Sequence, residues 1–450
     1  METIRWPYFD PEYETLSQRI NPPRVVIDNH SCEKYSLVKV DSANKHGSLL
    51  EVVQVLTDLD LVISKAYISS DGGWFMDVFH VTDQLGKKLT DEKLIDYIQQ
   101  ALGAKRSETT HKVKTCLGRT VGVQSIAEHT AIELIGTDRP GLLSEVSAVL
   151  TELKCNVVAA EVWTHNSRVA CVVYVTDEIV RGPIEDTQRL NTIKEQLVNV
   201  LKVKEDVKGA KTDFSMGLTH TERRLHQMMF ADRDYEGSNC TSLNRLDKPK
   251  ISIENCLDKG YSVVNIQSKD RPKLLFDTVC TLTDMQYVVF HAAINSDGPL
   301  AIQEYYIRHM DGCTLDTEGE KQRVIKCLEA AIERRVSQGI RLELCTSDRV
   351  GLLSDITRIF RENGLSVSRA DVNTEGDAAV NVFYVTNAAG GPVDMKTIEA
   401  VRNEIGRQIL RVKDVPKLGR SGYDVGDGPG KSGFSVGSLL KSLGLVKPCS

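Results

Sequence analysis

One motif occurs four times in this chain of 450 residues: a short apolar run, four turn-forming residues and then a helical pattern. The turn segments are Asn-Lys-His-Gly at 44–47, Asp-Arg-Pro-Gly at 138–141, Asp-Arg-Pro-Lys at 270–273 and Asp-Arg-Val-Gly at 348–351. Apolar residues recur after each segment at spacings of three and four, as in 142–153, which predicts a helix with one buried face. Such a repeat restricts the fold to several copies of one supersecondary unit.

Two strand-like runs and a second helical pattern follow the first helix in every copy. The first of these runs carries an alanine at a fixed offset from the turn segment, which indicates close packing there: Ala66, Ala160, Ala292 and Ala370. Adding a last strand to this β-α-β-β-α order gives a ferredoxin-like βαββαβ module. Residues 408–412 supply that strand in the fourth copy, and no separate segment for it is found in the third. The predicted fold class is α+β, with four ferredoxin-like modules.

The repeats divide most of the chain into predicted modules at residues 35–116, 131–218, 261–339 and 340–416. An N-terminal segment (1–34), a connector (219–260) and a Gly/Ser-rich tail (417–450) remain. Within the connector, the Met-rich stretch 221–230 is interpreted as a helix that packs between domains. The tail matches G-x-G-x-x-G at 428–433, but no strand precedes it, so a flexible linker is the better interpretation. Beyond it, five apolar residues predict a short amphipathic helix: Val436, Leu439, Leu440, Leu443 and Val446.

Composition excludes several classes of protein. A formal net charge of −6 argues against a broad nucleic-acid interface, which needs a basic surface. No apolar run is long enough for a signal peptide or an integral membrane segment. The 11 cysteines are scattered and form no C-x-x-C pair, as expected of reduced thiols. We therefore expect a cytoplasmic protein, with the nucleus as a second compartment, and the sequence indicates no cofactor, no metal site and no catalytic residue.

The turn segment has the chemistry of an anion site. Aspartate is a good N-cap, proline suits a first helical turn, and glycine lets another molecule approach the backbone. The amide groups near Gly141 and Leu142 can donate to the carboxylate of a free amino acid, and Asp138 can accept from its ammonium group. A capped helix start that binds nothing is the alternative interpretation.

The predicted ligand-binding residues come from all four copies, and the second and fourth are the best candidates. Copy three has Lys273 in place of glycine, and copy one has Asn44 and His46 in place of aspartate and proline. The full set is Asp138, Arg139, Pro140, Gly141 and Leu142; Asp348, Arg349, Gly351 and Leu352; Asn44 and Gly47; and Asp270.

The chain resembles the ACT-domain family, and most of all the plant proteins made of four ACT repeats. The resemblance is carried by Asp-Arg-Pro-Gly-Leu-Leu at 138–143 and Asp-Arg-Val-Gly-Leu-Leu at 348–353, with weaker forms at Asn44 and Asp270. It implies regulatory modules that pair side by side and bind amino acids at their interface, near this loop.

These observations predict a non-enzymatic regulatory sensor whose ligand is a free amino acid. Binding would stabilise one arrangement of the modules, which an unidentified protein partner then recognises. Self-association as a homo-oligomer is also compatible with the resemblance. The alternative is a ligand-free scaffold for protein interactions. An enzyme is disfavoured because the repeats occupy the length that a catalytic domain needs.

Overall fold

The computed structural model describes residues 23–43, 46–71, 73–103, 113–115, 120–121, 129–203, 208–215, 220–236, 248–256, 259–296, 298–336 and 339–413. The chain forms two compact units. The first, called the 1/3 pair, contains the described parts of 9–123 and 242–325, and the second, called the 2/4 pair, those of 124–241 and 326–416. Asn44 and the predicted tail helix lie outside the described residues.

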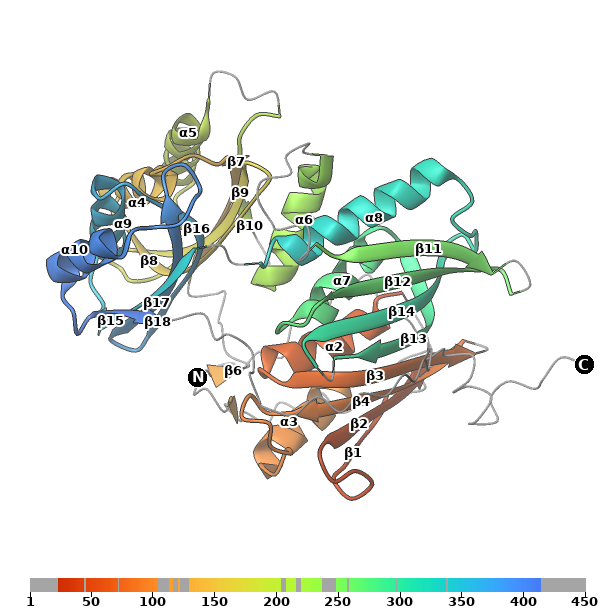
Figure 1. Ribbon diagram of the computed structural model, residues 1–450. Coiled ribbons are helices and arrows are strands. Elements are labelled where there is room, and N and C mark those ends of the chain that lie inside the picture. Colours follow the sequence, from red (N-terminus) through yellow and green to blue (C-terminus); the bar gives the residue numbers. More distant parts are fainter. Residues whose placement is uncertain are drawn as a thin grey trace, which may run out of the picture. The chain divides into compact units, whose positions relative to one another are not determined.

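One eight-stranded sheet forms the 1/3 pair, with the strands of module 1 beside those of module 3 (Figure 1). In spatial order the strands are β1 (Arg24–Asp28), β2 (Ser36–Ala43), β4 (Trp74–Thr82), β3 (Val62–Asp71), β13 (Tyr287–Asn295), β14 (Leu300–His309), β12 (Tyr261–Lys269) and β11 (Lys250–Cys256). The helices of these modules are α2 (Ser48–Asp58), α3 (Glu92–Leu102), α7 (Leu274–Asp284) and α8 (Glu318–Glu333), and the residues of α8 from 326 onward are grouped with the 2/4 pair. Two short strands, β5 (Val113–Lys114) and β6 (Thr120–Val121), pair separately.

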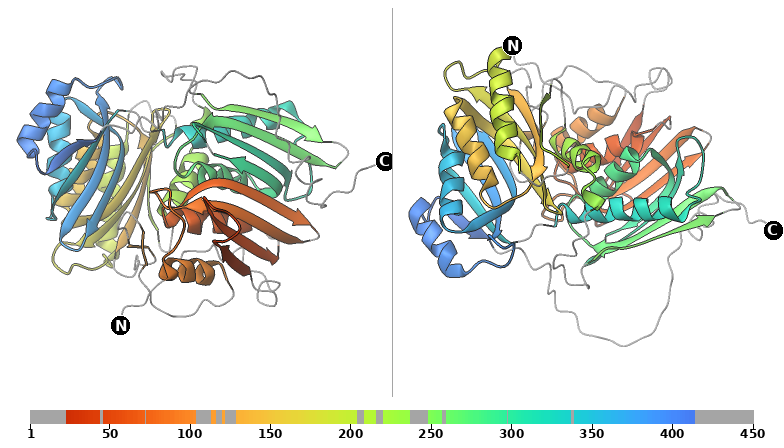
Figure 2. Two further views of the ribbon diagram at one scale, coloured as in Figure 1. Left: turned by 60° about the horizontal axis from the view of Figure 1, so that its bottom comes forward. Right: turned by 90° about the horizontal axis from the view of Figure 1, so that it is seen from above.

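A second eight-stranded sheet forms the 2/4 pair, and Figure 2 shows the yellow strands of module 2 beside the blue strands of module 4. In spatial order the strands are β10 (Lys211–Ser215), β7 (Thr130–Thr137), β9 (Arg168–Asp177), β8 (Cys155–His165), β16 (Leu365–Glu375), β17 (Ala378–Asn387), β15 (Ile340–Ser347) and β18 (Leu410–Lys413). The module helices are α4 (Leu142–Glu152), α5 (Thr187–Leu201), α9 (Leu352–Glu362) and α10 (Met395–Ile405).

The predicted alanines lie where two modules join. Antiparallel strands β8 and β16 connect modules 2 and 4, with Ala160 opposite Val372 and Ala370 opposite Val162. Strands β3 and β13 connect modules 1 and 3 in the same way, and all four alanines are buried. A small side chain at this register lets the first helices of the two modules pack together above the junction, α4 against α9 and α2 against α7. The prediction of ferredoxin-like modules paired side by side is confirmed, and each pair joins modules that are not consecutive in the chain.

The edge strand enters from opposite ends of the repeat in the two pairs. In modules 2 and 4 it follows the second helix, so that β10 pairs with β7 and β18 with β15. In modules 1 and 3 it comes first, so that β1 pairs with β2 and β11 with β12. Modules 1 and 3 therefore begin earlier than the predicted residues 35 and 261, because parts of the assigned N-terminal segment and connector are strands. This order also explains why the third copy shows no closing strand after its second helix.

The core of the 2/4 pair lies between the sheet and its four module helices. It is continuous across both modules, and the rings of Phe360 and Phe383 meet edge to face at 5.2 Å within it. On the other face of the sheet, alternate residues of β7, β8 and β9 pack against α6 (Thr221–Ala231), which is the helix predicted in the connector. Trp163 and Met229 are fully buried there. The short helix η3 (Asp234–Glu236) follows α6.

Among the residues that the structure describes, no helix has the length and apolar character needed to span a membrane.

Candidate functional site

The turn that joins the first strand of a module to its first helix is called its corner, and the corners of modules 2 and 4 comprise residues 138–141 and 348–351. Gly141 and Gly351 are the N-cap residues of α4 and α9, with φ angles of +81° and +79°. Only glycine adopts this left-handed conformation readily. The expectation that the aspartate caps the helix is wrong, because the N-cap residue stands three residues after it and no side chain caps either helix.

The aspartate instead ends the first strand and is fixed by a neighbouring hairpin. The Asp138 N–H donates to the Ser167 carbonyl at 2.9 Å, and the Asp348 N–H donates to the Asp377 carbonyl at 2.8 Å. Both acceptors lie in the turn between the second and third strands of the module. The carboxyl group of the aspartate is thereby held at the end of the sheet, next to the start of the helix.

Each corner leaves two helical amides without an acceptor. In module 2 the Leu142 N–H donates to the Arg139 carbonyl at 3.1 Å, and the Glu145 N–H donates to the Gly141 carbonyl at 3.1 Å. The amides between them, of Leu143 and Ser144, have no acceptor among the described residues. The same holds for Leu353 and Ser354 in module 4. Two free N–H groups at the positive end of a helix dipole form a site for an anion.

The predicted ligand-binding arginines are already paired within their own modules. Arg139 donates to Glu145, with 2.8 Å between Nη1 and Oε1, and also to the Val200 carbonyl at 3.1 Å. This pairing lowers the pKa of the Glu145 carboxyl. Arg349 donates to Asp355 at 2.5 Å in the same way. These arginines therefore hold the corner against the first turn of the helix, and the acidic partners were not found by sequence reasoning.

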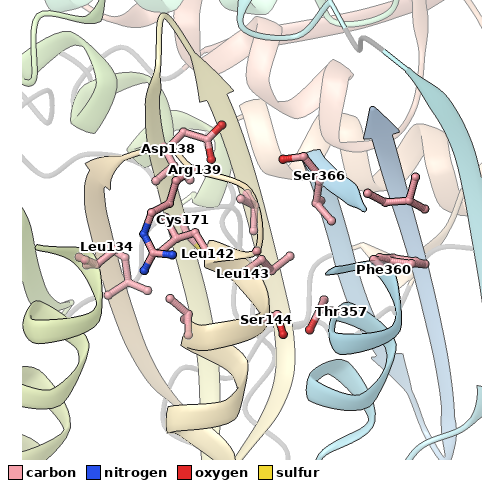
Figure 3. Close-up of a pocket in the computed structure, with 17 residues that line it drawn as sticks. Leu134, Asp138, Arg139, Leu142, Leu143, Ser144, Cys171, Thr357, Phe360 and Ser366 are labelled. Atoms are coloured by element: carbon pink, nitrogen blue, oxygen red, sulfur yellow. The ribbon is translucent and has the colours of Figure 1, made fainter. Parts of the chain in front are cut away.

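Site 1 is the cavity at the corner of module 2, and module 4 supplies its other wall. Asp138, Arg139, Gly141 and Leu142 line it, whereas Pro140 does not. Module 4 contributes Thr357 and Phe360 from α9 and the start of β16: Leu365, Ser366 and Val367. Figure 3 shows Ser144 and Thr357 facing each other across the cavity, while Arg139 points away from α9. The cavity volume is about 30 Å³.

Site 2 is the equivalent cavity at the corner of module 4, with a volume of about 20 Å³. Asp348, Arg349, Gly351 and Leu352 line it, so all the predicted residues of this corner are brought together. Module 2 contributes Ser147 and Thr151 from α4 and the start of β8: Cys155, Asn156 and Val157. Gly351 stands 210 positions after Gly141, and the same interval relates the walls of the two sites.

One pair of equivalent residues makes the two corners unequal. A Cβ atom at Gly141 would lie 2.7 Å from Cδ of Arg361, whose side chain crosses this corner. A Cβ atom at Gly351 would lie 3.4 Å from Cγ2 of Thr151, the residue equivalent to Arg361. The capping glycine of module 2 therefore has a long, flexible cation as its neighbour, and that of module 4 has a short hydroxyl side chain.

Asp138 titrates in an unusual range. Burial of its carboxyl group raises the pKa to about 6, because hydrogen bonding by the Arg139 backbone and the positive charge of Arg139 offset the loss of water only in part. The carboxylate is charged at neutral pH, when it can accept from an ammonium group, and it becomes protonated in mildly acidic solution.

The capping residues of the 1/3 pair have the same left-handed backbone as those of the 2/4 pair and different side chains around them. Gly47 caps α2 with a φ of +87°, and Lys273 caps α7 with a φ of +65°, which is unusual for a residue other than glycine. The Asp270 N–H donates to the Pro299 carbonyl at 3.1 Å, and burial raises the pKa of the Asp270 carboxyl. Arg271 pairs with Asp277 at 2.7 Å.

Sequence reasoning missed the residues that each module contributes to its neighbour's corner. Phe360, Thr357 and Ser366 of module 4 belong to site 1, and Thr151 and Asn156 of module 2 belong to site 2. The repeat interval was visible in the sequence, but it does not reveal which modules pair. These walls become identifiable only when module 2 is placed beside module 4.

Comparison with known proteins agrees with this architecture. The model of the ACR family N-terminal ACT domain matches residues 31–109, and that of the ACT domain matches 130–200 and 340–403. The chain is 60% identical to the ACT domain-containing protein ACR3 of Arabidopsis thaliana, over 98% of this chain and 100% of that protein. It is 56% identical to ACR4 of the same plant, over 97% and 96%. A match to the solved structure titled as a putative glycine cleavage system transcriptional repressor covers 46% of this chain and 94% of that chain, at 14% identity and a TM-score of 0.18.

The ferredoxin-like modules, their side-by-side pairing and these matches define a protein built from ACT domains. The chain belongs to the ACR family of ACT domain-containing proteins.

Proposed function

We propose that this protein is a non-enzymatic sensor that binds a free amino acid at sites 1 and 2. One observation carries the proposal: each corner of the 2/4 pair places two free helical amides next to a strand-terminal carboxylate. The amides carry partial positive charge and the carboxylate is negative, so together they are complementary to the carboxylate and ammonium groups of a free amino acid. A simple helix start does not need both.

The two ends of the ligand would meet different partners. Its α-carboxylate would accept from the amides of Leu143 and Ser144 in site 1, or of Leu353 and Ser354 in site 2. Its ammonium group would donate to Asp138 or Asp348. Because Asp138 has a raised pKa, binding at site 1 should weaken below about pH 6.

The small size of the cavities supports a link between binding and module arrangement. One water molecule needs a cavity of roughly 10–15 Å³, so cavities of about 30 and 20 Å³ hold one or two waters and are too small for an amino acid. Entry of the ligand must displace side chains that belong to both modules, such as Leu142 and Phe360 at site 1. The ligand would therefore favour a different spacing of α4 and α9.

A continuous set of hydrogen bonds connects site 1 to the opposite face of the sheet. The Asp138 N–H binds Ser167 in the β8–β9 turn. In the same turn, Asn166 donates to the Asp234 carbonyl at 2.8 Å, and Arg168 donates to the Asp232 carboxylate at 2.6 Å. A displacement of the corner would be transmitted to the end of α6 through these hydrogen bonds. A protein partner would then recognise the changed position of α6.

Calorimetric titration with a panel of amino acids tests the proposal directly. We expect a saturable heat and a rise in melting temperature with at least one of them. The double variant Gly141→Val, Gly351→Val should remove both effects, because each new side chain fills a corner and strains a left-handed residue. Gly390→Val is the matched control, since its φ is +78° and no atom lies within 4 Å of a Cβ placed there.

Two results would contradict the proposal. If no amino acid binds the wild-type chain at millimolar concentration, the chain is a ligand-free scaffold, and partner capture should be insensitive to the double variant. If the purified chain turns over a nucleotide or an amino acid, the non-enzymatic part of the proposal is wrong.

A further inference from the structure

Sites 1 and 2 differ at the positions that would surround a ligand side chain. Cys171 on β9 lines site 1, and the equivalent position on β17 in site 2 is Asn381. The register confirms the equivalence, because Cys171 lies opposite Val162 and Asn381 lies opposite Val372. At the opposite wall, Ser366 of site 1 corresponds to Asn156 of site 2. Site 2 therefore has two carboxamide side chains where site 1 has a thiol and a hydroxyl group.

Asn381 is buried with one half of its amide unused. Asn381 is only 2% exposed, and its Oδ1 atom accepts a hydrogen bond from the Asn373 N–H at 3.2 Å. Its Nδ2 group has no acceptor among the described residues, although the residue lines site 2. The Nδ2 group can therefore donate to an acceptor that a ligand brings into this cavity.

Asn156 extends this polar wall from the other module. It is half-buried on β8, lines site 2, and its carboxamide has no partner among the described residues. Thr374 donates to the Asp348 carboxylate at 3.3 Å, which orients that carboxylate within the same cavity. The hydrogen-bonding groups of site 2 thus converge from both modules.

The part of site 1 around Cys171 is apolar. Cys171 is 4% exposed and packs among Val162, Val169 and Leu201. Burial raises the pKa of its thiol well above the usual range, so the group stays neutral and behaves as a small hydrophobic side chain. Phe360 closes the far wall (Figure 3). A polar ligand side chain would lose its hydration here without gaining hydrogen bonds.

Resting on the amino-acid binding proposed above, we infer that the two sites select different side chains: site 1 an apolar one, and site 2 an uncharged one that carries a hydrogen-bond acceptor. Asn381 is the specificity-determining residue of site 2, and Cys171 occupies the equivalent position in site 1. One pair of modules would thereby bind two classes of amino acid.

L-Leucine and L-asparagine are suitable probes, because their side chains have nearly the same size and shape and differ in polarity. Gly141→Val leaves only site 2 open, and we expect it to bind asparagine at least about 10-fold more tightly than leucine, as for sites that hydrogen-bond a substrate. Gly351→Val leaves only site 1 open and should prefer leucine. Adding Asn381→Cys to the Gly141→Val chain should abolish the preference for asparagine, and adding Cys171→Asn to the Gly351→Val chain should reduce the preference for leucine.

The outcomes separate this inference from the proposed function. If amino acids bind but both single-site chains show the same preference, the inference is overturned and the proposed function stands. It is also overturned if Asn381→Cys leaves asparagine affinity unchanged in a chain with a native circular dichroism spectrum. If neither probe nor any other amino acid binds the wild-type chain, the proposed function fails first. Asn403→Ser, at an exposed position on α10 of the same module, is the control for nonspecific effects.

Discussion

The 1/3 and 2/4 pairs share one architecture and differ in how it is completed. Each has eight strands, an antiparallel junction and buried alanines at the same register. In one pair the edge strands arrive before the repeat, and in the other they arrive after it. The position beside the first strand of a module accepts a strand of either origin, because antiparallel pairing there needs only a free strand edge. The repeated sequence therefore determines the first three strands and two helices of a module, and the chain before or after the repeat supplies its edge strand.

The corners of the two pairs differ in chemistry, although their capping residues share a left-handed backbone. Both corners of the 2/4 pair have glycine at the N-cap, whereas the 1/3 pair has Gly47 and Lys273. Only the 2/4 pair has α6 and η3 on the other face of its sheet, among the described elements. Ligand binding and its transmission are therefore both expected in the 2/4 pair, and the 1/3 pair serves as an internal control.

The largest expected effect comes from the buried ion pair behind the 2/4 sheet. Asp234 receives two hydrogen bonds from Arg334, and the two side chains are 0% and 2% exposed. Asp234→Asn leaves a buried charge uncompensated, which should lower the free energy of unfolding by about 3–5 kcal/mol. Hydrogen exchange should show the loss in β8 and β9, with β3 and β13 retaining their protection.

Asp213→Asn is the control for this experiment, because Asp213 pairs with Lys194 at an exposed position and such pairs contribute about 0–1 kcal/mol. Equal losses of protection in both sheets would contradict the distinction between the pairs.

Asp138→Asn should produce the next largest effect, and its sign depends on pH. The pKa of Asp138 is raised in the folded state, so the protonated form is favoured there, and stability is lost as the pH rises from the unfolded value through about 6. The amide cannot ionise, so the variant should be more stable than the wild type by about 2 kcal/mol at pH 7 and equally stable near pH 4. Chemical denaturation at the two pH values measures the difference.

Asp348→Asn is the matched comparison in module 4. The Asp348 carboxylate accepts from Thr374, so its replacement should give no comparable gain. A gain of the same size in both variants would show that the two corners are electrostatically alike.

The corners themselves were predictable from sequence, and their environment was not. Asp138, Gly141 and the alanine at 160 stand at fixed positions in a repeat, so local patterns were enough to place them on a strand end, a turn and a packed strand. Arg361 and Asn156 lie far along the chain from Gly141 and Gly351, and they reach those corners only through the junction of β8 with β16. Strand junctions depend on tertiary packing, for which a single sequence carries no periodic signal.

The edge strands β1 and β11 were missed for a related reason. Both are short, and both precede the motif that identified their modules. The repeat also implied a last strand after the second helix, as modules 2 and 4 have, which directed attention to the wrong side of modules 1 and 3.

Alanine at the two capping glycines should give a smaller, graded effect. Gly141→Ala and Gly351→Ala place the same side chain in the same left-handed conformation, which costs about 1–2 kcal/mol in either case. The new methyl group at 141 must also displace Arg361, whereas at 351 it meets Thr151 at an acceptable distance. Gly141→Ala should therefore be the more destabilising of the two in thermal melts. Adding Arg361→Ala should make them equal, and a persistent difference would place its cause elsewhere in the corner.

The smallest effect is expected in module 3, where Lys273 adopts a conformation suited to glycine. Its φ of +65° is unfavourable for a side chain with a Cβ atom, and no side chain caps α7. Lys273→Gly removes that strain but adds entropy to the unfolded chain, so the net gain should be about 0.5–1 kcal/mol. Denaturant melts measure this gain, and Lys273→Ala, which keeps the Cβ atom, should not show it. The same substitution can also be tested for binding in a Gly141→Val, Gly351→Val chain, in which sites 1 and 2 are closed. If Lys273→Gly created amino-acid binding there, the absence of a glycine at position 273 would be what restricts ligand binding to the 2/4 pair.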